Sequence, residues 1–319
     1  MREHIKDLWK NQAIMALVLA VLLFIITGVF RPQAMNMGTV SSIAAIASIL
    51  VFASAGQCII IISGNGGIDL SAGAVMSTTA VISVEMMKGD ASMILPTLIV
   101  CILVGVVIGA INGIGVSYVG LPALIMTMCV SNILGKVQLI ISGGAPRGTA
   151  AKEMSKLLTT RYFGFIPGIF LLAICFFVLT VVLIRYTRFG YRLMLIGTND
   201  AAAYLSGIKV KQVRLIAYAV GGMLAGIGGF IAAGYYSQAQ CATFDSYSMM
   251  SISAVVIGGT LLSGGKGNFT GTVFGALLLT VLSNFLTAIN TSPAVRDIIM
   301  GAILIVLMAA YNRKESLRQ

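Results

Sequence analysis

The stretch from Ser253 to Leu279 joins two strongly apolar blocks through a glycine-rich hinge. It reads SAVVIGGTLLSGGKGNFTGTVFGALLL, and Lys266 is its one charged residue. Each block is long enough for a helix at membrane depth, and a soluble fold would not surround this hinge with so much Val, Ile, Leu and Phe. The stretch therefore predicts two membrane segments that meet at a tight turn of small residues.

The composition extends this interpretation to the whole chain. Of 319 residues, 58% are hydrophobic and only 10% are charged, whereas soluble domains carry about 25% charged residues. A helix needs roughly 20 apolar residues to cross a bilayer. The strands of a membrane barrel would instead be about ten residues long with strict alternation, and the runs here are long and continuous. We expect an all-α, polytopic helical membrane protein.

Hydropathy predicts about ten transmembrane helices within a single transmembrane domain that covers residues 1–319. An even number places both termini on one side, and the excess of Lys and Arg in the segments facing that side indicates the cytoplasm. The net charge of +11 then reflects membrane flanks, and no nucleic-acid partner is expected. The predicted spans are 13–30, 41–63, 68–87, 94–117, 121–142, 166–185, 212–234, 249–264, 268–288 and 294–311.

One predicted periplasmic loop, residues 143–165, departs from the positive-inside rule. It has Glu153 as its sole acid. Two interpretations stay open: a solvated loop, or a docking surface for an acidic soluble partner, since charges at the rim of an interface steer encounter. Its basic residues are Arg147, Lys152, Lys156 and Arg161.

The longest predicted cytoplasmic segment, residues 186–211, contains a predicted short helix from Asn199 to Ser206. Asn199 or Thr198 is suited to cap its N-terminus, Asp200 lies favourably in the first turn, and Gly207 is suited to end it. Such a helix is either a connector on the lipid surface or a handle through which a cytoplasmic motor moves the membrane part.

Polar residues within the predicted spans either join helices or line a wet path, and joining is the commoner role. For Asp69, which follows the glycines of GNGGIDLS, we favour capping of the next helix over contact with substrate or protons. The candidates for a translocation path are Asp69, Ser71, Asn112, Asn132, Ser251, Ser253 and Asn284. Glycines at four-residue spacing, as in Gly105, Gly109 and Gly113, predict closely packed helices.

The residues offer no enzymatic chemistry, and we expect no metal or cofactor on this chain. The only histidine is His4, which argues against a zinc site or a catalytic triad. The hinge SGGKG is not a phosphate loop, because Thr260 and Gly267 stand where that motif needs glycine and a hydroxyl residue. The five cysteines have no short pair spacing: Cys58, Cys101, Cys129, Cys175 and Cys241.

Four stretches together resemble the permease subunit of bacterial ABC sugar importers of the ribose/xylose/galactose type. Residues 67–73, GIDLSAG, are similar to the family's GGIDLSVG, and residues 121–127, LPALIMT, to its LPxFIxT. TRFG at 187–190 with GTNDAAAYLSGI at 197–208 resembles its coupling segment TxFGR…GGNxxAARLSGI. AVVIGGTLLSGGKG at 254–267 resembles AVVLGGTSLSGGRG.

The resemblance implies an inner-membrane pathway made of two permease subunits, a homo- or heterodimer. A cytoplasmic ATP-binding subunit hydrolyses ATP, and a periplasmic binding protein delivers the sugar. The family's coupling helix maps onto Asn199, Asp200, Ala201, Ala202, Ser206 and Gly207, and the basic loop gains a partner in the binding protein. The chain departs from the family pattern at Thr198, Tyr191 and Tyr204.

A second hypothesis belongs to another class. It is an ATP-independent secondary transporter or channel for a small polar solute, in which Asp69 would be central. Neither hypothesis identifies the solute, and hydropathy does not define which face of each helix lines the path.

Overall fold

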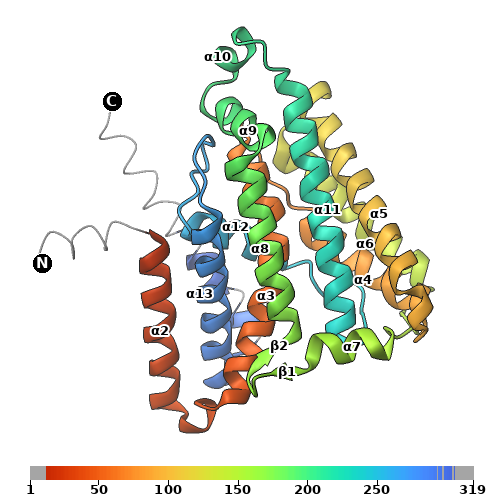
Figure 1. Cartoon of the computed structure of the whole chain (residues 1–319), viewed down its shortest axis with the longest axis vertical. Coiled ribbons are helices and arrows are strands. Elements are labelled where there is room, and N and C mark those ends of the chain that lie inside the picture. The colour runs from red at the N-terminus through yellow and green to blue at the C-terminus, as the bar shows by residue number, and fades with distance from the viewer. Residues whose placement is uncertain (1–11, 293, 297, 304, 306–319) are drawn as a thin grey trace, which may run out of the picture.

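The chain folds into one bundle of helices, most of which run side by side (Figure 1). The structure, a computed structural model, describes residues 12–292, 294–296, 298–303 and 305. The long helices are α2 (Gln12–Phe30), α3 (Met37–Ile62), α4 (Ala72–Met87), α5 (Ile94–Ile114), α6 (Ala123–Ser142), α8 (Gly168–Tyr186), α11 (Val210–Tyr236) and α13 (Phe269–Ala288). The shorter elements are α7 (Lys152–Thr159), α9 (Arg188–Thr198), α10 (Asp200–Leu205), α12 (Tyr247–Ile257), and the antiparallel strands β1 (Arg161–Tyr162) and β2 (Ile166–Pro167).

The predicted all-α class is confirmed at the level of helical content and membrane-capable helices. Among the described residues, seven helical segments are long and apolar enough to cross a membrane, while α4 and α12 are apolar but shorter. The predicted span 249–264 is wrong in its extent, because α12 ends at Ile257 and has 11 residues. At 1.5 Å per residue it is about 16 Å long, roughly half of the hydrocarbon thickness. The predicted span 294–311 lies partly outside the described residues.

Helices α4 and α12 both begin inside the bundle and start from the same place. The backbone N–H of Gly73 donates to Ser248 Oγ over 2.8 Å, and Ser248 Oγ donates to the carbonyl of Leu70 over 2.8 Å. From there α4 runs toward the end of the bundle that carries α7, since Gly89, just beyond α4, bonds to the carbonyl of Thr149. The loop after α12 reaches the opposite end, the end of α9 and α10 (Figure 1).

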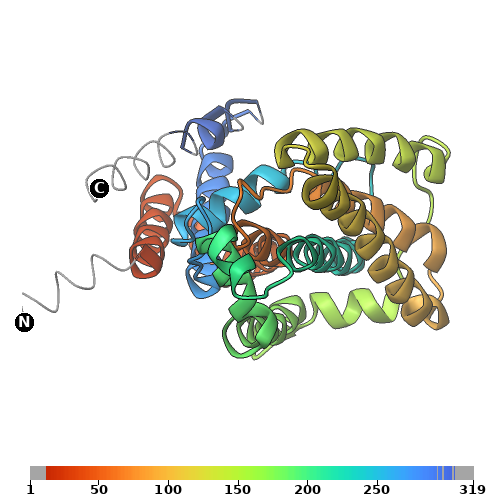
Figure 2. The same cartoon turned by 90° about the horizontal axis from the view of Figure 1, so that it is seen from above.

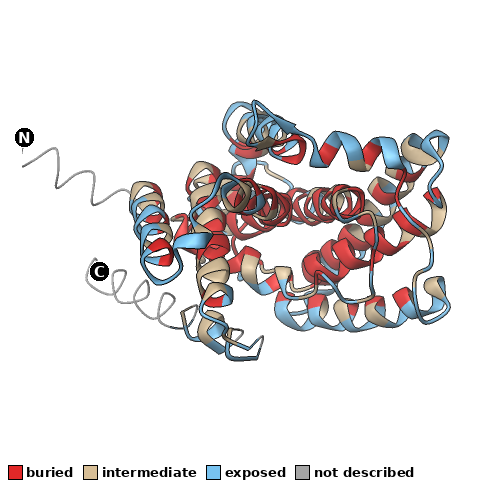
Figure 3. Ribbon diagram, turned by 90° about the horizontal axis from the view of Figure 1, so that it is seen from below, coloured by how far each residue is buried: buried red, intermediate tan, exposed pale blue. Residues whose placement is uncertain are grey.

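The centre of the bundle consists of α3, α4 and α11. Buried residues gather in the middle and exposed residues lie along the edges (Figure 3). Helix α11 packs on α5 at glycines: a Cβ added to Gly222 would meet the carbonyl oxygen of Gly105, and one on Gly105 would meet that of Gly222. The expected close packing at four-residue glycine spacing is therefore present.

Two short helices mark the two ends of the bundle, with α10 at one and α7 at the other (Figure 1). Seen from above, α6 and α12 lie along one long edge, α7 and α8 lie along the opposite edge, and α11 lies between them (Figure 2). The predicted loop 143–165 is not featureless, because it contains α7 and the strand β1, which pairs with β2 just beyond it. Buried Met154 and Leu158 hold α7 against the end of α11 at Gly234.

We predict that Gly222→Ala lowers the free energy of unfolding by about 1–3 kcal/mol, because the new methyl group has no space against the α5 backbone. Gly135→Ala is the matched control, since nothing lies within 4 Å of a Cβ at that helical position. It should raise stability by about 0.5–1 kcal/mol. Thermal unfolding in detergent measures both, and equal melting temperatures for the two variants would contradict the prediction.

Candidate functional site

Three glycine-containing segments meet at the end of the bundle that carries α10. The backbone N–H of Gly265 donates to the carbonyl of Ile62 over 3.0 Å, and a Cβ on Gly64 would lie 2.8 Å from Gly197 Cα. Gly64 and Gly264 have φ of +71° and +90°, a conformation that glycine adopts without steric cost. The hinge, the GNGGIDLS segment and the coupling segment therefore form one junction, which side chains at these glycines would force apart.

The predicted short helix in the coupling segment is confirmed as α10. Asn199 Oδ1 accepts a hydrogen bond from the backbone N–H of Ala202 over 3.0 Å, so Asn199 is the N-cap. Ser206 is the C-cap, and Gly207 follows with φ of +79°. The helix before it, α9, was not predicted, and its N-cap is Thr187, whose Oγ1 accepts from the N–H of Gly190 over 3.1 Å.

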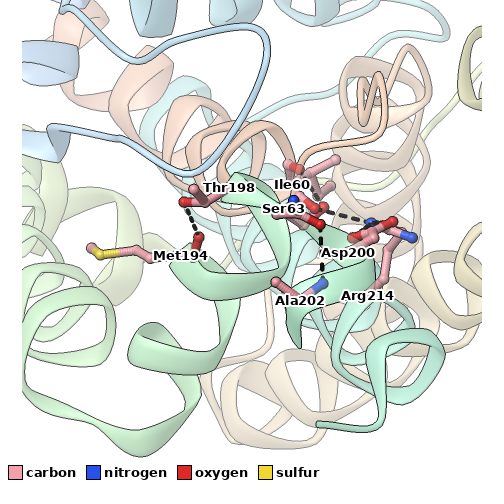
Figure 4. A network of polar contacts seen from close by, with 8 residues as sticks. Ile60, Ser63, Met194, Thr198, Asp200, Ala202 and Arg214 are labelled. Carbon is pink, nitrogen blue, oxygen red and sulfur yellow. Dashed lines mark hydrogen bonds and ion pairs between the residues drawn. The ribbon is translucent and has the colours of Figure 1, made fainter. Parts of the chain in front are cut away.

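An ion pair ties α10 to the bundle. Arg214 Nη2, in the first turns of α11, donates to both carboxylate oxygens of Asp200 over 2.8 Å each, and to the carbonyl of Ser63 at the end of α3 over 3.2 Å (Figure 4). Arg214 is buried, whereas the side chain of Asp200 is 42% exposed. Three elements thus share one guanidinium group, so that α10 is linked to α3 and α11 together.

Sequence reasoning missed Arg214 as a functional candidate. Its partners lie 14 and 151 residues away, so no local pattern identifies them. Its one visible signal is a basic residue inside the apolar helix that follows the coupling segment.

The outer face of α10 is apolar and uncovered. Tyr204 is 72% exposed and Leu205 is 85% exposed, while Ala203 alone in this helix is buried. The other candidate coupling residues Ala201 and Ala202 are exposed as well. Large exposed apolar side chains on a short helix beyond the membrane-capable segments are typical of a surface that another protein covers.

The structure brings three candidate path residues together in a buried polar cluster. Asp69 Oδ1 accepts hydrogen bonds from the backbone N–H and the hydroxyl of Ser71 over 2.7 and 2.6 Å, and Asn112 Nδ2 donates to Ser71 Oγ over 2.8 Å. All three residues are buried. Asp69 thus shapes the turn before α4, while Ser71 is the residue at the N-cap and makes no side-chain capping bond.

The other four path candidates are separate from this cluster. Ser251 and Ser253 are buried in α12 and donate to carbonyls of their own segment, those of Ser248 and Met249. Asn284 is half-buried in α13, and Asn132 is exposed on α6. Five of the seven candidates are therefore buried, and Asn132 alone among the seven is exposed.

The predicted docking residues Arg147, Lys152, Lys156 and Arg161 are all exposed. They lie on and beside α7, at the end of the bundle opposite α10 (Figure 1). Ser155 Oγ donates to the carbonyl of Gly234 over 2.8 Å, which fixes α7 so that Lys152 and Lys156 face outward. The four cations thus form a basic surface on a rigid support.

Known proteins match this chain over most of its length. Residues 39–308 match the family described as the permease component of the branched-chain amino acid transport system. The ribose import permease protein of Haemophilus influenzae is 29% identical over 296 residues, which cover 92% of this chain and 90% of the relative. The corresponding protein of Escherichia coli K12 is 27% identical over 318 residues, 98% of each chain.

Two further relatives are named for other transport functions. A probable ABC transporter permease of Sinorhizobium fredii is 30% identical and covers 90% of this chain and 86% of the relative. An autoinducer 2 import permease of Escherichia coli SMS-3-5 is 27% identical and covers 97% and 89%. No solved structure matches. Because the family match spans 39–308 and includes the glycine junction, α10 and α12, this chain belongs to the family of membrane permease components of ABC transport systems.

Proposed function

We propose that this chain is the permease subunit of an ABC importer for a sugar or sugar-like solute. The observation that carries the proposal is α10, a capped helix with an apolar outer face that is tied to two central helices by the Asp200–Arg214 ion pair. Relatives named for ribose and autoinducer 2 import support the class of solute.

In this proposal the chain is a single transmembrane unit of the bacterial inner membrane, with about ten spans and cytoplasmic termini. A second permease subunit completes the path, a separate cytoplasmic subunit hydrolyses ATP, and this chain holds no cofactor. The end with α10 faces the cytoplasm, because a motor must reach that helix. The end with α7 faces the periplasm, where its four cations meet acidic residues of a binding protein.

Transport follows from the mechanical link at α10. The ATP-binding subunit moves α10, Asp200 pulls on Arg214, and α3 and α11 shift as rigid bodies, since glycine contacts leave little room for deformation. This couples two sites through one two-state element, as allosteric coupling requires. A secondary transporter is disfavoured, because Asp69 is engaged with Ser71 inside the chain.

The defining experiment measures uptake into proteoliposomes that contain this chain and its co-purified partners. Radiolabelled pentoses and hexoses are supplied with and without ATP on the side of α10. We expect accumulation of one sugar that requires both ATP and the binding protein. Uptake that ignores ATP and follows an ion gradient would overturn the proposal.

Asp200→Asn should uncouple transport from ATP hydrolysis, since the neutral amide binds Arg214 weakly. We expect solute uptake to fall several-fold while ATP hydrolysis continues, and Asp200→Arg to abolish uptake. The unfolding free energy should fall by about 1–2 kcal/mol, because charge-assisted bonds contribute roughly 1.5–3 kcal/mol and exposure weakens them. Asp90→Asn is the control, since an amide oxygen still accepts from the N–H of Ser92. Wild-type uptake by both Asp200 variants would refute the coupling role.

Leu205→Asp should weaken association with the ATP-binding subunit by at least tenfold in Kd, because burying a carboxylate in an apolar interface costs more than about 1.4 kcal/mol. Co-purification and titration of the detached subunit measure this. Lys156→Glu, at the other end of the bundle, is the matched variant. It should leave that association unchanged and reduce the stimulation of ATP hydrolysis by the binding protein. The reverse pattern would show that the two ends have been assigned to the wrong partners.

A further inference from the structure

A carboxylate that the sequence analysis did not select, Asp245, lies where α4 and α12 begin. Ser77 Oγ, in α4, donates to Asp245 Oδ1 over 2.9 Å, and the backbone N–H of Phe244 donates to Ser77 Oγ over 2.9 Å. Asp245 is half-buried. The carboxylate is thus fixed against a central helix while part of it stays open to the surroundings.

Asp245 lies near the middle of the membrane-capable part of the bundle. Ser77 precedes Met87, the last residue of α4, by ten residues, which corresponds to about 15 Å along the helix. In the other direction, α12 continues for 11 residues toward the end that carries α10. A depth of about 15 Å is half the thickness of the hydrocarbon layer.

No cation neutralises this carboxylate. Within residues 12–292 and the described positions after them, the only ion pair joins Asp200 and Arg214. An unpaired charge at this depth is expensive in lipid and is tolerated where it faces a water-filled cavity or a bound solute. The half-exposed side of Asp245 therefore does not face lipid.

The residues next to Asp245 carry hydroxyl groups. Thr243 and Ser246 flank it and are exposed. The segment is attached to α6, because the N–H of Ala242 donates to Gln138 Oε1 over 2.8 Å. Thr243, Ser246 and Ser77 thus surround the carboxylate with hydroxyl groups, which acyl chains cannot solvate.

We propose that Asp245 contacts the solute in the translocation path and selects neutral, hydroxyl-bearing solutes over anions, an inference that rests on the proposed importer function. An ionised carboxylate only accepts hydrogen bonds. Ser77 occupies one position on Oδ1, which leaves Oδ2 to accept from solute hydroxyls, and such charge-assisted bonds are strong. The same negative charge repels phosphorylated or carboxylated solutes.

The first test measures the potential beside Asp245 directly. Ser246→Cys is placed in a chain in which Cys129, Cys175 and Cys241, the cysteines that are not buried, are alanine. The complete importer in lipid nanodiscs, with and without ATP and vanadate, is treated with trimethylammonium-ethyl or sulfonato-ethyl methanethiosulfonate. We expect Ser246→Cys to react with both, and several-fold faster with the cationic reagent.

Matched variants separate charge from access. Adding Asp245→Asn should remove the preference for the cation without slowing the anionic reagent, and Asp245→Glu should restore it. Val178→Cys on α8, which is 51% exposed on the opposite edge, should react slowly with either reagent because lipid covers it. Equal rates for both reagents in the presence of Asp245, no reaction of Ser246→Cys, or its spontaneous disulfide with a second copy would each overturn the proposal.

The second test measures transport. Asp245→Asn should reduce uptake of D-ribose, D-xylose or D-galactose, whichever the importer accepts, while the binding protein still stimulates ATP hydrolysis. Asp90→Asn should leave uptake unchanged. Undiminished uptake by Asp245→Asn would refute this inference alone. If uptake ignores ATP, but Ser246→Cys still reacts with the water-soluble reagents and prefers the cationic one, the importer function is refuted and the path assignment is retained.

Discussion

Every backbone N–H and C=O group at membrane depth must find a partner within the protein, and the interrupted helices of this chain depend on that constraint. Between α3 and α4, the N–H of Leu70 donates to Thr127 Oγ1 over 3.0 Å. Between α11 and α12, the N–H of Ala242 is bound by Gln138. Both hydrogen-bond acceptors belong to α6, so the two breaks are stable only when α6 is in place.

The same side chains that satisfy the breaks also position the polar interior. Ser248 bonds to the backbone of Gly73 and Leu70, and Ser77 bonds to Phe244 and Asp245. Each of these hydroxyls serves α4 and the start of α12 at once. A shift of α4 relative to α12 would therefore change the position of Asp245 together with the backbone around it.

At the end of the bundle that carries α10, the constraint is steric as well as polar. Gly64, Gly197 and Gly265 bring two loops and the last turn of α9 into backbone contact, and Arg214 connects α10 to the ends of α3 and α11. Close-packed backbones transmit displacement with little loss because they have no side chains that rearrange. The glycine hinge and the ion pair together explain how motion at α10 reaches helices in the centre of the bundle.

Local chemistry in the sequence determined the helical membrane class, the glycine hinge around Lys266 and a capped short helix within 199–206, because hydropathy and capping depend on residues close together in the chain. It also selected polar residues by type alone, and two of these, Ser251 and Ser253, bond within their own segment. Only the tertiary structure decided that α12 stops after 11 residues, that Asp200 binds Arg214, and that Asp245 is half-exposed at mid-depth. Those features depend on how each helix is rotated and on which distant segments meet, and hydropathy carries no information about either.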